Sequence, residues 1–133
     1  MQKVMLVDDD VDIIENYRPV LENAGYEVRF AHDGVSGFAL FKEFLPDVAI
    51  VDLSMEHFDS GFTLCKRIKD TPEGRDTPVI ILTSAGHDTG YRFSTQSEEE
   101  KQWIKADHFL DKPVAPQDLL QFLHDRVLKS AEV

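Results

Sequence analysis

The sequence has little cysteine, little positive charge and no long apolar run. A single cysteine, Cys65, among 133 residues excludes an internal disulfide and indicates a reducing compartment. Fourteen basic residues against 25 acidic ones give a formal net charge of −11, which disfavours direct binding to nucleic acid or anionic lipid. No apolar run approaches the roughly 18 residues of a membrane span, and the first run turns acidic at residue 8, too early for a signal peptide. We therefore expect a cytoplasmic protein whose partners are cations or basic protein surfaces.

The length and composition are those of one globular domain. Hydrophobic residues make up 42% of the chain and charged residues 29%, a balance that excludes a disordered or fibrous protein. A domain of this size buries roughly two-thirds of its unfolded surface and needs no disulfide. We predict one domain over residues 1–128 and a frayed tail over residues 129–133.

Short apolar runs alternate with stretches of helical periodicity along the chain. The expected strands cover residues 4–7, 26–31, 48–51, 78–82 and 106–110. The expected helices run from Ile13 to a stop at Gly25, from Val35 to a stop at Pro46, around Leu64 and Ile68, over residues 98–105, and from Pro116 to Val127. This repeated β–α order predicts a doubly wound parallel sheet with helices on both faces and right-handed crossovers.

Aspartates follow two of the expected strands at the point where each strand ends. Asp8, Asp9 and Asp10 come directly after the first strand, and Asp52 comes after the third. In open α/β sheets ligands bind beyond the carboxyl ends of the strands, and neighbouring strands lie about 5 Å apart. If these two strands are neighbours, the carboxylates converge and repel one another unless a cation neutralises them. A hard divalent ion such as Mg²⁺, bound by carboxylates, waters and a phosphate, fits such a site.

A hydroxyl and an ammonium group follow two further strands. Thr83 comes after the fourth strand, and Lys112, before Pro113, comes after the fifth. Each residue alone is more often an ordinary turn or cap residue. Together with the acids and Mg²⁺ they are the groups that phosphoryl transfer requires, because that chemistry depends on positioning and charge neutralisation. A carboxylate can itself be the nucleophile and form an aspartyl phosphate.

Four motifs at these strand ends resemble the signatures of one known family. They are Val7-Asp8-Asp9, Val51-Asp52-Leu53-Ser54-Met55, Leu82-Thr83-Ser84 and Asp111-Lys112-Pro113. In this order they resemble the receiver domain of response regulators in two-component signalling, from about residue 3 to residue 128. The resemblance implies a flavodoxin-like α/β fold, a five-stranded sheet of order 2-1-3-4-5. It also implies that the protein takes a phosphoryl group from a histidine kinase or phosphotransfer protein.

The resemblance also implies a role for each acid. Asp52 is the expected phosphoacceptor. Asp9 and Asp52 are expected to ligate Mg²⁺ directly, Asp8 through a water molecule, and Ser54 through its backbone carbonyl.

Three further residues have implied roles in transfer and in switching. Lys112 is expected to pair with the phosphoryl oxygens, and Thr83 to hydrogen-bond one of them after phosphorylation. Phe109, three residues before the lysine, occupies the family's switch-aromatic position. Its rotamer is expected to change together with the movement of Thr83.

The sequence departs from the family's pattern at two places. Glu56 stands where proline is frequent, and Gly61 comes about one residue later than the usual glycine, so we expect a reshaped loop over residues 56–60. The stretch from Thr83 to Lys112 is also several residues longer than is common. We expect an individual partner surface there, while the phosphorylation chemistry is retained.

The remaining reactive side chains have ordinary interpretations. The histidines lack metal-ligand spacing and are expected on the surface: His32, His57, His87, His108 and His124. Cys65, on an apolar helix face, is expected in the core. Trp103 is expected to be a packing anchor.

We expect a stand-alone receiver that acts as a relay, a phosphate sink or a regulator of a downstream protein target. The resemblance also allows a phosphorylation-dependent homodimer. Such a protein is a phosphoacceptor that assists its own phosphorylation and dephosphorylation, not a turnover enzyme.

Three alternatives remain open. A Mg²⁺-dependent phosphatase or phosphotransferase would use Asp52 as its nucleophile, although haloacid-dehalogenase-type enzymes place that aspartate after the first strand. A flavodoxin-type cofactor binder would need a Ser/Thr/Gly-rich loop where this chain has Asp8, Asp9 and Asp10. A degenerate receiver would bind partners without phosphorylation.

Overall fold

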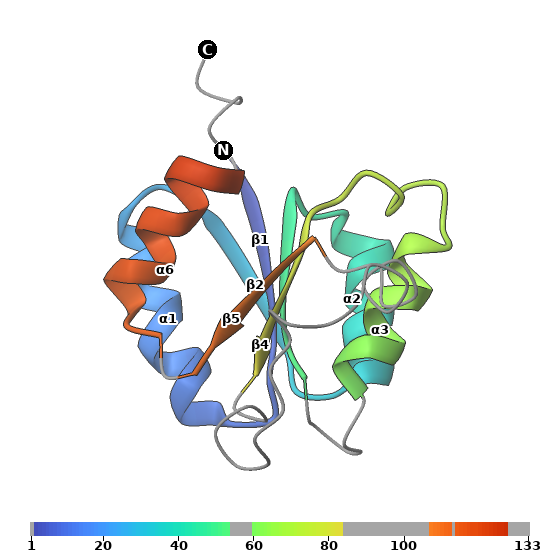
Figure 1. Cartoon of the computed structure of the whole chain (residues 1–133), viewed down its shortest axis with the longest axis horizontal. Coiled ribbons are helices and arrows are strands. Elements are labelled where there is room, and N and C mark those ends of the chain that lie inside the picture. Colours follow the sequence, from blue (N-terminus) through green and yellow to red (C-terminus); the bar gives the residue numbers. More distant parts are fainter. Residues whose placement is uncertain (1, 54–59, 84–106, 113, 128–133) are drawn as a thin grey trace.

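Five short runs form the strands of one parallel sheet, and the runs of its three middle strands are mostly apolar (Figure 1). The structure is a computed structural model and describes residues 2–53, 60–83, 107–112 and 114–127. The strands are β1 (Lys3–Val7), β2 (Glu27–Ala31), β3 (Val48–Asp52), β4 (Val79–Thr83) and β5 (His108–Asp111). The three central strands, β1, β3 and β4, are almost wholly buried because helices cover both of their faces, whereas the edge strands β2 and β5 are partly exposed.

The strand order is β2-β1-β3-β4-β5, and every pair is parallel. From β1 the chain adds β2 on one side and then β3, β4 and β5 on the other, so the strand order reverses between β1 and β3. Ligands bind at this switch point in such folds. In the β1–β3 register Val7 pairs with Val51, so the next residues, Asp8 just after β1 and Asp52 at the end of β3, lie side by side. The prediction of a doubly wound, flavodoxin-like sheet is confirmed.

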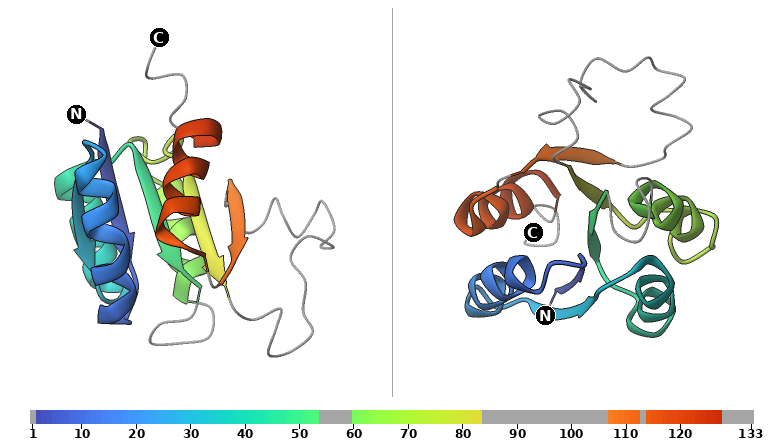
Figure 2. Two further views of the ribbon diagram at one scale, coloured as in Figure 1. Left: turned by 90° about the vertical axis from the view of Figure 1, so that its left-hand side faces the viewer. Right: turned by 90° about the horizontal axis from the view of Figure 1, so that it is seen from below.

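Two helical layers cover the sheet. The helices are α1 (Val11–Asn23), α2 (Gly34–Phe44), α3 (Ser60–Lys69) and α6 (Pro116–Phe122), and α6 continues as the π-helical segment η2 (Leu123–Val127). Helices α1 and α6 lie on one face, and α2 and α3 lie on the other (Figure 2). Alternate residues of a strand therefore enter different cores: Met5 packs on the α2–α3 side and Leu6 on the α1–α6 side.

Backbone conformation ends the first two helices. Helix α1 stops before Gly25, whose φ of 101° favours a residue without a Cβ atom, as the sequence predicts. Helix α2 ends at Phe44, before the expected stop at Pro46. The reason is that Leu45 adopts the left-handed conformation, with φ 50°, and its N–H donates to the carbonyl of Phe41.

Helix α1 contains a proline that sequence rules would place at a helix end. Pro19 lies inside the helix and lacks the N–H that would donate one turn back. The helix nevertheless continues through residue 23, because Ile14, Tyr17 and Leu21 are buried against the sheet on both sides of the proline.

The fifth strand begins two residues later than the sequence predicts. The backbone N–H of Asp107 donates to the carbonyl of Val79 at 3.0 Å, and its carboxylate accepts from the N–H of Val79 at 2.8 Å. The same carboxylate forms an ion pair with Lys69 at 2.7 Å. A side chain thus takes the place of one backbone ladder partner, and regular pairing starts at His108.

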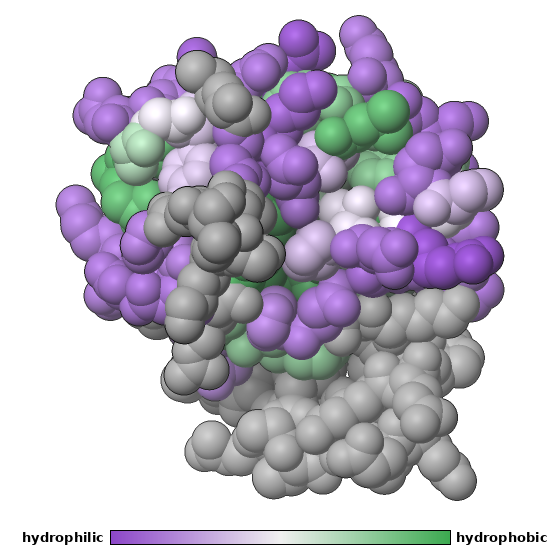
Figure 3. Space-filling view, turned by 90° about the horizontal axis from the view of Figure 1, so that it is seen from above, coloured by the Kyte–Doolittle hydropathy of each residue, from purple (hydrophilic) through white to green (hydrophobic). Residues whose placement is uncertain are grey.

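The surface opposite the carboxyl ends of the strands is mainly hydrophilic where the structure describes it (Figure 3). Apolar residues gather there only in small separate areas (Figure 3). Among the described helices, none combines the length and the apolar character that a bilayer-spanning segment needs.

Several expectations for individual residues are tested by the fold. Cys65 is fully buried, as predicted. His32 and His124 are exposed, whereas His108 is half-buried with its ring 5.2 Å from that of Phe122. The expected helix over residues 98–105, with Trp103, lies outside the described residues, as do His57, His87, most of the 56–60 loop and the 129–133 tail.

A close approach of α3 to the end of β3 requires the glycine at position 61. The N–H of Gly61 donates to the carbonyl of Leu53 at 2.7 Å. A Cβ atom here would lie 2.5 Å from the carbonyl oxygen of Asp52 and 2.6 Å from the Cα of Leu53. Because both neighbours are backbone atoms, neither can turn aside, and the glycine determines how closely α3 packs beneath the site.

We predict that Gly61→Ala lowers the free energy of unfolding by about 1–3 kcal/mol, since a methyl group must displace backbone. Urea unfolding followed by circular dichroism measures this. Gly37→Ala is the matched control: the atoms nearest to its methyl group would be side-chain atoms of Leu64 and Val7, at 3.0–3.2 Å. Its expected change is within about 1 kcal/mol, because better helix propensity offsets the crowding. Equal stability of wild type and Gly61→Ala would contradict the prediction.

Candidate functional site

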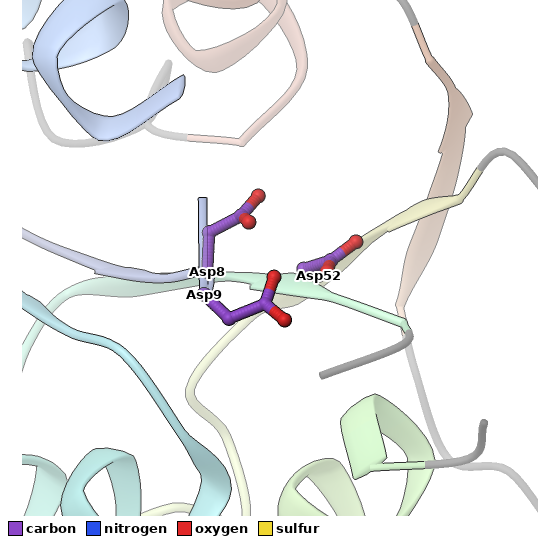
Figure 4. Close-up of side chains that lie close together, drawn as sticks. All are labelled: Asp8, Asp9 and Asp52. Carbon is purple, nitrogen blue, oxygen red and sulfur yellow. The ribbon is translucent and has the colours of Figure 1, made fainter. Parts of the chain in front are cut away.

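Three carboxylates converge at the carboxyl ends of the neighbouring strands β1 and β3. Asp8 and Asp9 follow β1 and Asp52 ends β3, and one oxygen from each lies within 4.8 Å of the others. Successive side chains of an extended segment point to opposite faces. Figure 4 accordingly shows Asp8 directed toward the layer of α1 and α6, Asp9 toward the layer of α2 and α3, and Asp52 beside them. Asp8 and Asp52 are buried, whereas Asp9 is exposed.

Backbone hydrogen bonds fix the loop that carries the first two acids. The N–H of Asp8 donates to the carbonyl of Ala31 at 3.1 Å, which extends the β1–β2 ladder by one residue. The N–H of Asp10 donates to Asp8 Oδ1 at 2.9 Å. The side chain of Asp10 then caps α1 by accepting from the N–H of Asp12. Asp8 is therefore held by hydrogen bonds between the end of β1 and the N-cap of α1.

Lys112 brings the only ammonium group that contacts these carboxylates within the described residues. Its Nζ lies 3.2 Å from Asp8 Oδ2 and 2.9 Å from Asp52 Oδ1, and its side chain is only 17% exposed. Its backbone N–H donates to the carbonyl of Thr83 at 2.8 Å, which continues the β4–β5 ladder. The lysine predicted to meet a phosphoryl group therefore also contacts two acids.

Burial and this ion pairing act in opposite directions on the acids. Burial raises the pKa of Asp52 to about 6, although the hydrogen bond from Lys112 opposes the shift. Burial also raises the pKa of Asp8, against the backbone hydrogen bond from Asp10 and the charge of Lys112. Burial lowers the pKa of Lys112, but its contacts with Asp52 and Asp8 outweigh that effect and the net shift is upward. Lys112 is therefore charged, and its charge does not fully compensate the two buried acids.

Thr83 and Phe109 lie on the neighbouring strands β4 and β5, as the sequence predicts. Thr83 ends β4 and is 1% exposed. Phe109 lies on β5 and packs on the α2–α3 core, with its ring edge-on to that of Phe62 at 6.4 Å between centroids. Ser54, the remaining predicted site residue, lies outside the described residues.

The donor set fits a hard divalent cation. It offers three carboxylates, two of them buried, and carboxylate oxygens are the ligands that Mg²⁺ prefers. Burial raises the pKa of Asp8 and of Asp52, and a cation beside them would oppose that shift. Two contacts of the site had no signal in the sequence: the ion pair of Lys112 with Asp8 and the hydrogen bond from Tyr17 to Val114, each joining residues about a hundred positions apart.

Comparison with known proteins identifies a family with this arrangement. The family model described as "Response regulator receiver domain" matches residues 4–124. The transcriptional regulator RpaA of Synechocystis sp., named as DNA-binding, is 34% identical over 122 residues, which is 90% of this chain and 46% of that protein. The response regulator MprA of Mycobacterium avium is 32% identical over 118 residues, 89% of this chain and 47% of that protein. The chain thus spans about half the length of these relatives.

Solved structures of similar proteins have the same fold. The chemotaxis protein CheY4 of Vibrio cholerae has a TM-score of 0.78 and 34% identity, with 96% of this chain and 99% of that chain covered. A response regulator receiver domain protein from Clostridium thermocellum has a TM-score of 0.77 and 28% identity, with 99% and 98% covered.

We predict that Asp52→Asn raises the free energy of unfolding of the metal-free protein at pH 8 by about 1–3 kcal/mol, because it removes an incompletely neutralised buried charge. The magnitude follows from the pKa shift, since one pKa unit corresponds to about 1.4 kcal/mol. The folded-state pKa of Asp52 is raised, from 3.8 to about 6, so the wild type loses stability as pH rises through 6 and regains it toward pH 4. The difference in the free energy of unfolding between variant and wild type should therefore reach its full size above pH 6 and be small near pH 4. Urea unfolding in EDTA at several pH values measures it.

Asp10→Asn is the control for that measurement. Asp10 is exposed, and asparagine preserves its helix cap. We expect this variant to follow the wild-type pH dependence. Equal stability of wild type and Asp52→Asn at pH 8 would contradict the placement of Asp52 as an incompletely neutralised buried acid.

Proposed function

The chain belongs to the response regulator receiver domain family, and on that premise we propose that Asp52 accepts a phosphoryl group from a phosphohistidine. The donor is a histidine kinase or a phosphotransfer protein. One observation carries the proposal: Asp52, a buried carboxylate at the topological switch point, lies 2.9 Å from the Lys112 ammonium and within 4.8 Å of two more acids. A nucleophile, a fixed cation and a set of metal ligands are thus within reach of one phosphoryl group.

In the proposed reaction a carboxylate oxygen of Asp52 attacks phosphorus. An O–P bond forms as the P–N bond to the donor's imidazole breaks, and its electron pair goes to the imidazole nitrogen. Lys112 is already held by the backbone of β4, so its ammonium is available to the phosphoryl oxygens without a large rearrangement. The ammonium of Lys112 is thus in place to stabilise the negative charge of the phosphoryl group that is transferred to Asp52.

Asp9 and Asp52 would hold Mg²⁺ directly, and Asp8 would hold it through water. The ion supplies charge neutralisation for the transferring phosphoryl group when it is bound. The exposed position of Asp9, beside two buried acids, supports a metal that enters from solvent. Ser54 is the further proposed ligand, through its carbonyl.

The proposed output is a change in protein contacts. Thr83 would hydrogen-bond a phosphoryl oxygen, and Phe109 on the next strand would change rotamer with it, which alters the surface seen by a downstream protein or a second copy. In this proposal the protein works in the cytoplasm, transfers one phosphoryl group per cycle and is not a turnover enzyme.

Phosphorylation is tested by intact mass after incubation with Mg²⁺ and acetyl phosphate. We expect the wild type to gain one phosphoryl group, Asp10→Asn to gain one as well, and Asp52→Ala to gain none; EDTA should block the reaction. A gain in Asp52→Ala would assign another acceptor. No gain in the wild type, from acetyl phosphate or from a panel of phosphorylated histidine kinases, would favour a phosphorylation-independent binding domain.

The metal site is tested by Mg²⁺ titration, followed by NMR shifts of the backbone amides. We expect Asp9→Asn to weaken Mg²⁺ binding by about tenfold or more, because it removes a direct carboxylate ligand. Asp10→Asn, one residue away, removes the same charge but no ligand, and should change the Kd by less than about threefold. Equal weakening in both variants would indicate a diffuse electrostatic effect in place of a defined site.

A further inference from the structure

We propose that Tyr17 is the positioning residue for Lys112: its hydroxyl anchors the segment after β5 so that the ammonium lies between Asp8 and Asp52. The expected effect on phosphoryl transfer rests on the proposed function. The effect of Tyr17 on the position of Lys112 can be tested without that function.

The contact that carries the inference is a hydrogen bond between helix α1 and the chain after β5. Tyr17 Oη donates to the carbonyl oxygen of Val114 at 2.8 Å. Tyr17 is 6% exposed and lies in the apolar core between α1 and the sheet. An unpaired hydroxyl would be costly in that environment, so the Tyr17 hydroxyl depends on the carbonyl of the half-buried Val114.

Val114 is two residues from the lysine, and the bond restrains the chain on that side. On the other side, the N–H of Lys112 donates to the carbonyl of Thr83. Proline at position 113 has no N–H to offer a third restraint. The backbone of Lys112 is therefore held from β4 on one side and from α1 on the other.

A backbone restraint matters here because the lysine side chain is long and flexible. Its Nζ must remain 3.2 Å from Asp8 and 2.9 Å from Asp52. Fixing such a side chain costs conformational entropy, and movement of its backbone would open both contacts. The hydrogen bond from Tyr17 to Val114 thus helps to keep Lys112 beside the two acids, although Tyr17 itself contacts neither acid through this bond.

The electrostatics of the phenol agree with this proximity. Burial raises the pKa of Tyr17, with the charge of Lys112 opposing the shift and that of Asp8 adding to it. The phenol consequently stays protonated and acts as the hydrogen-bond donor. Helix α1 therefore connects the two halves of the site: its N-cap, Asp10, lies beside the acids, and its Tyr17 contacts the segment after Lys112.

The test compares Tyr17→Phe, which keeps the ring and removes the hydroxyl, with Tyr26→Phe. Tyr26 packs against the same core but lies at the amino-terminal end of β2, whereas Lys112 lies at the carboxyl ends of the strands. The first readout is the ¹⁵Nζ resonance of Lys112 in metal-free protein, assigned with Lys112→Ala. We expect Tyr17→Phe to shift or broaden this resonance and Tyr26→Phe to leave it unchanged. An unchanged resonance in Tyr17→Phe overturns the proposal, whether or not the protein accepts phosphate.

Two further readouts separate positioning from general packing. With acetyl phosphate, Tyr17→Phe should react about threefold to tenfold more slowly than wild type, the effect of losing one hydrogen bond. Its Mg²⁺ Kd should be equal to or lower than that of wild type, since a released Lys112 competes less for the carboxylates. A loosened core would weaken metal binding and slow the reaction together, and that result would overturn the proposal. Failure of the wild type to react would refute the proposed function, while the resonance and the Mg²⁺ titration would still decide the role of Tyr17.

Discussion

An ammonium group held between two buried carboxylates is the constraint on which this site depends. Lys112 contacts Asp8 and Asp52, and this cation opposes the rise in pKa that burial causes in both acids. The compensation is incomplete, because the pKa of both acids is still raised. A cation added here would therefore complete a charge balance that Lys112 leaves incomplete.

This balance can exist only in a parallel sheet of the observed order. The three groups come from the ends of β1, β3 and β5, which lie at one edge because every strand runs in the same direction. The close packing of α3 at Gly61 holds the end of β3, and the hydrogen bond from Lys112 to Thr83 extends the β4–β5 ladder toward the site. The fold and the chemistry are therefore not independent, since the contacts that complete the sheet also set the distances between charges.

Much of the fold and most of the site could be predicted from the sequence. Buried runs such as residues 48–51 are recognisable because a strand covered on both faces must be apolar throughout, and acids at two strand ends indicate where a ligand binds. Boundaries were less predictable: Leu45 ends α2 through its backbone conformation, and the Asp107 carboxylate delays β5. Pro19 would have ended α1 by local rules, but burial of the residues around it prevails.

The sequence by itself determined which groups the site contains: the aspartates after β1 and β3, the threonine after β4 and the lysine after β5. Their identities are local, and local periodicity places each at a strand end. Only the tertiary structure decided how they interact. It brings Lys112 to Asp8 across 104 positions and Tyr17 to Val114 across 97, and it buries Asp8 while leaving its neighbour Asp9 exposed. Distances and burial of this kind depend on how the strands and helices pack, which no short stretch of sequence encodes.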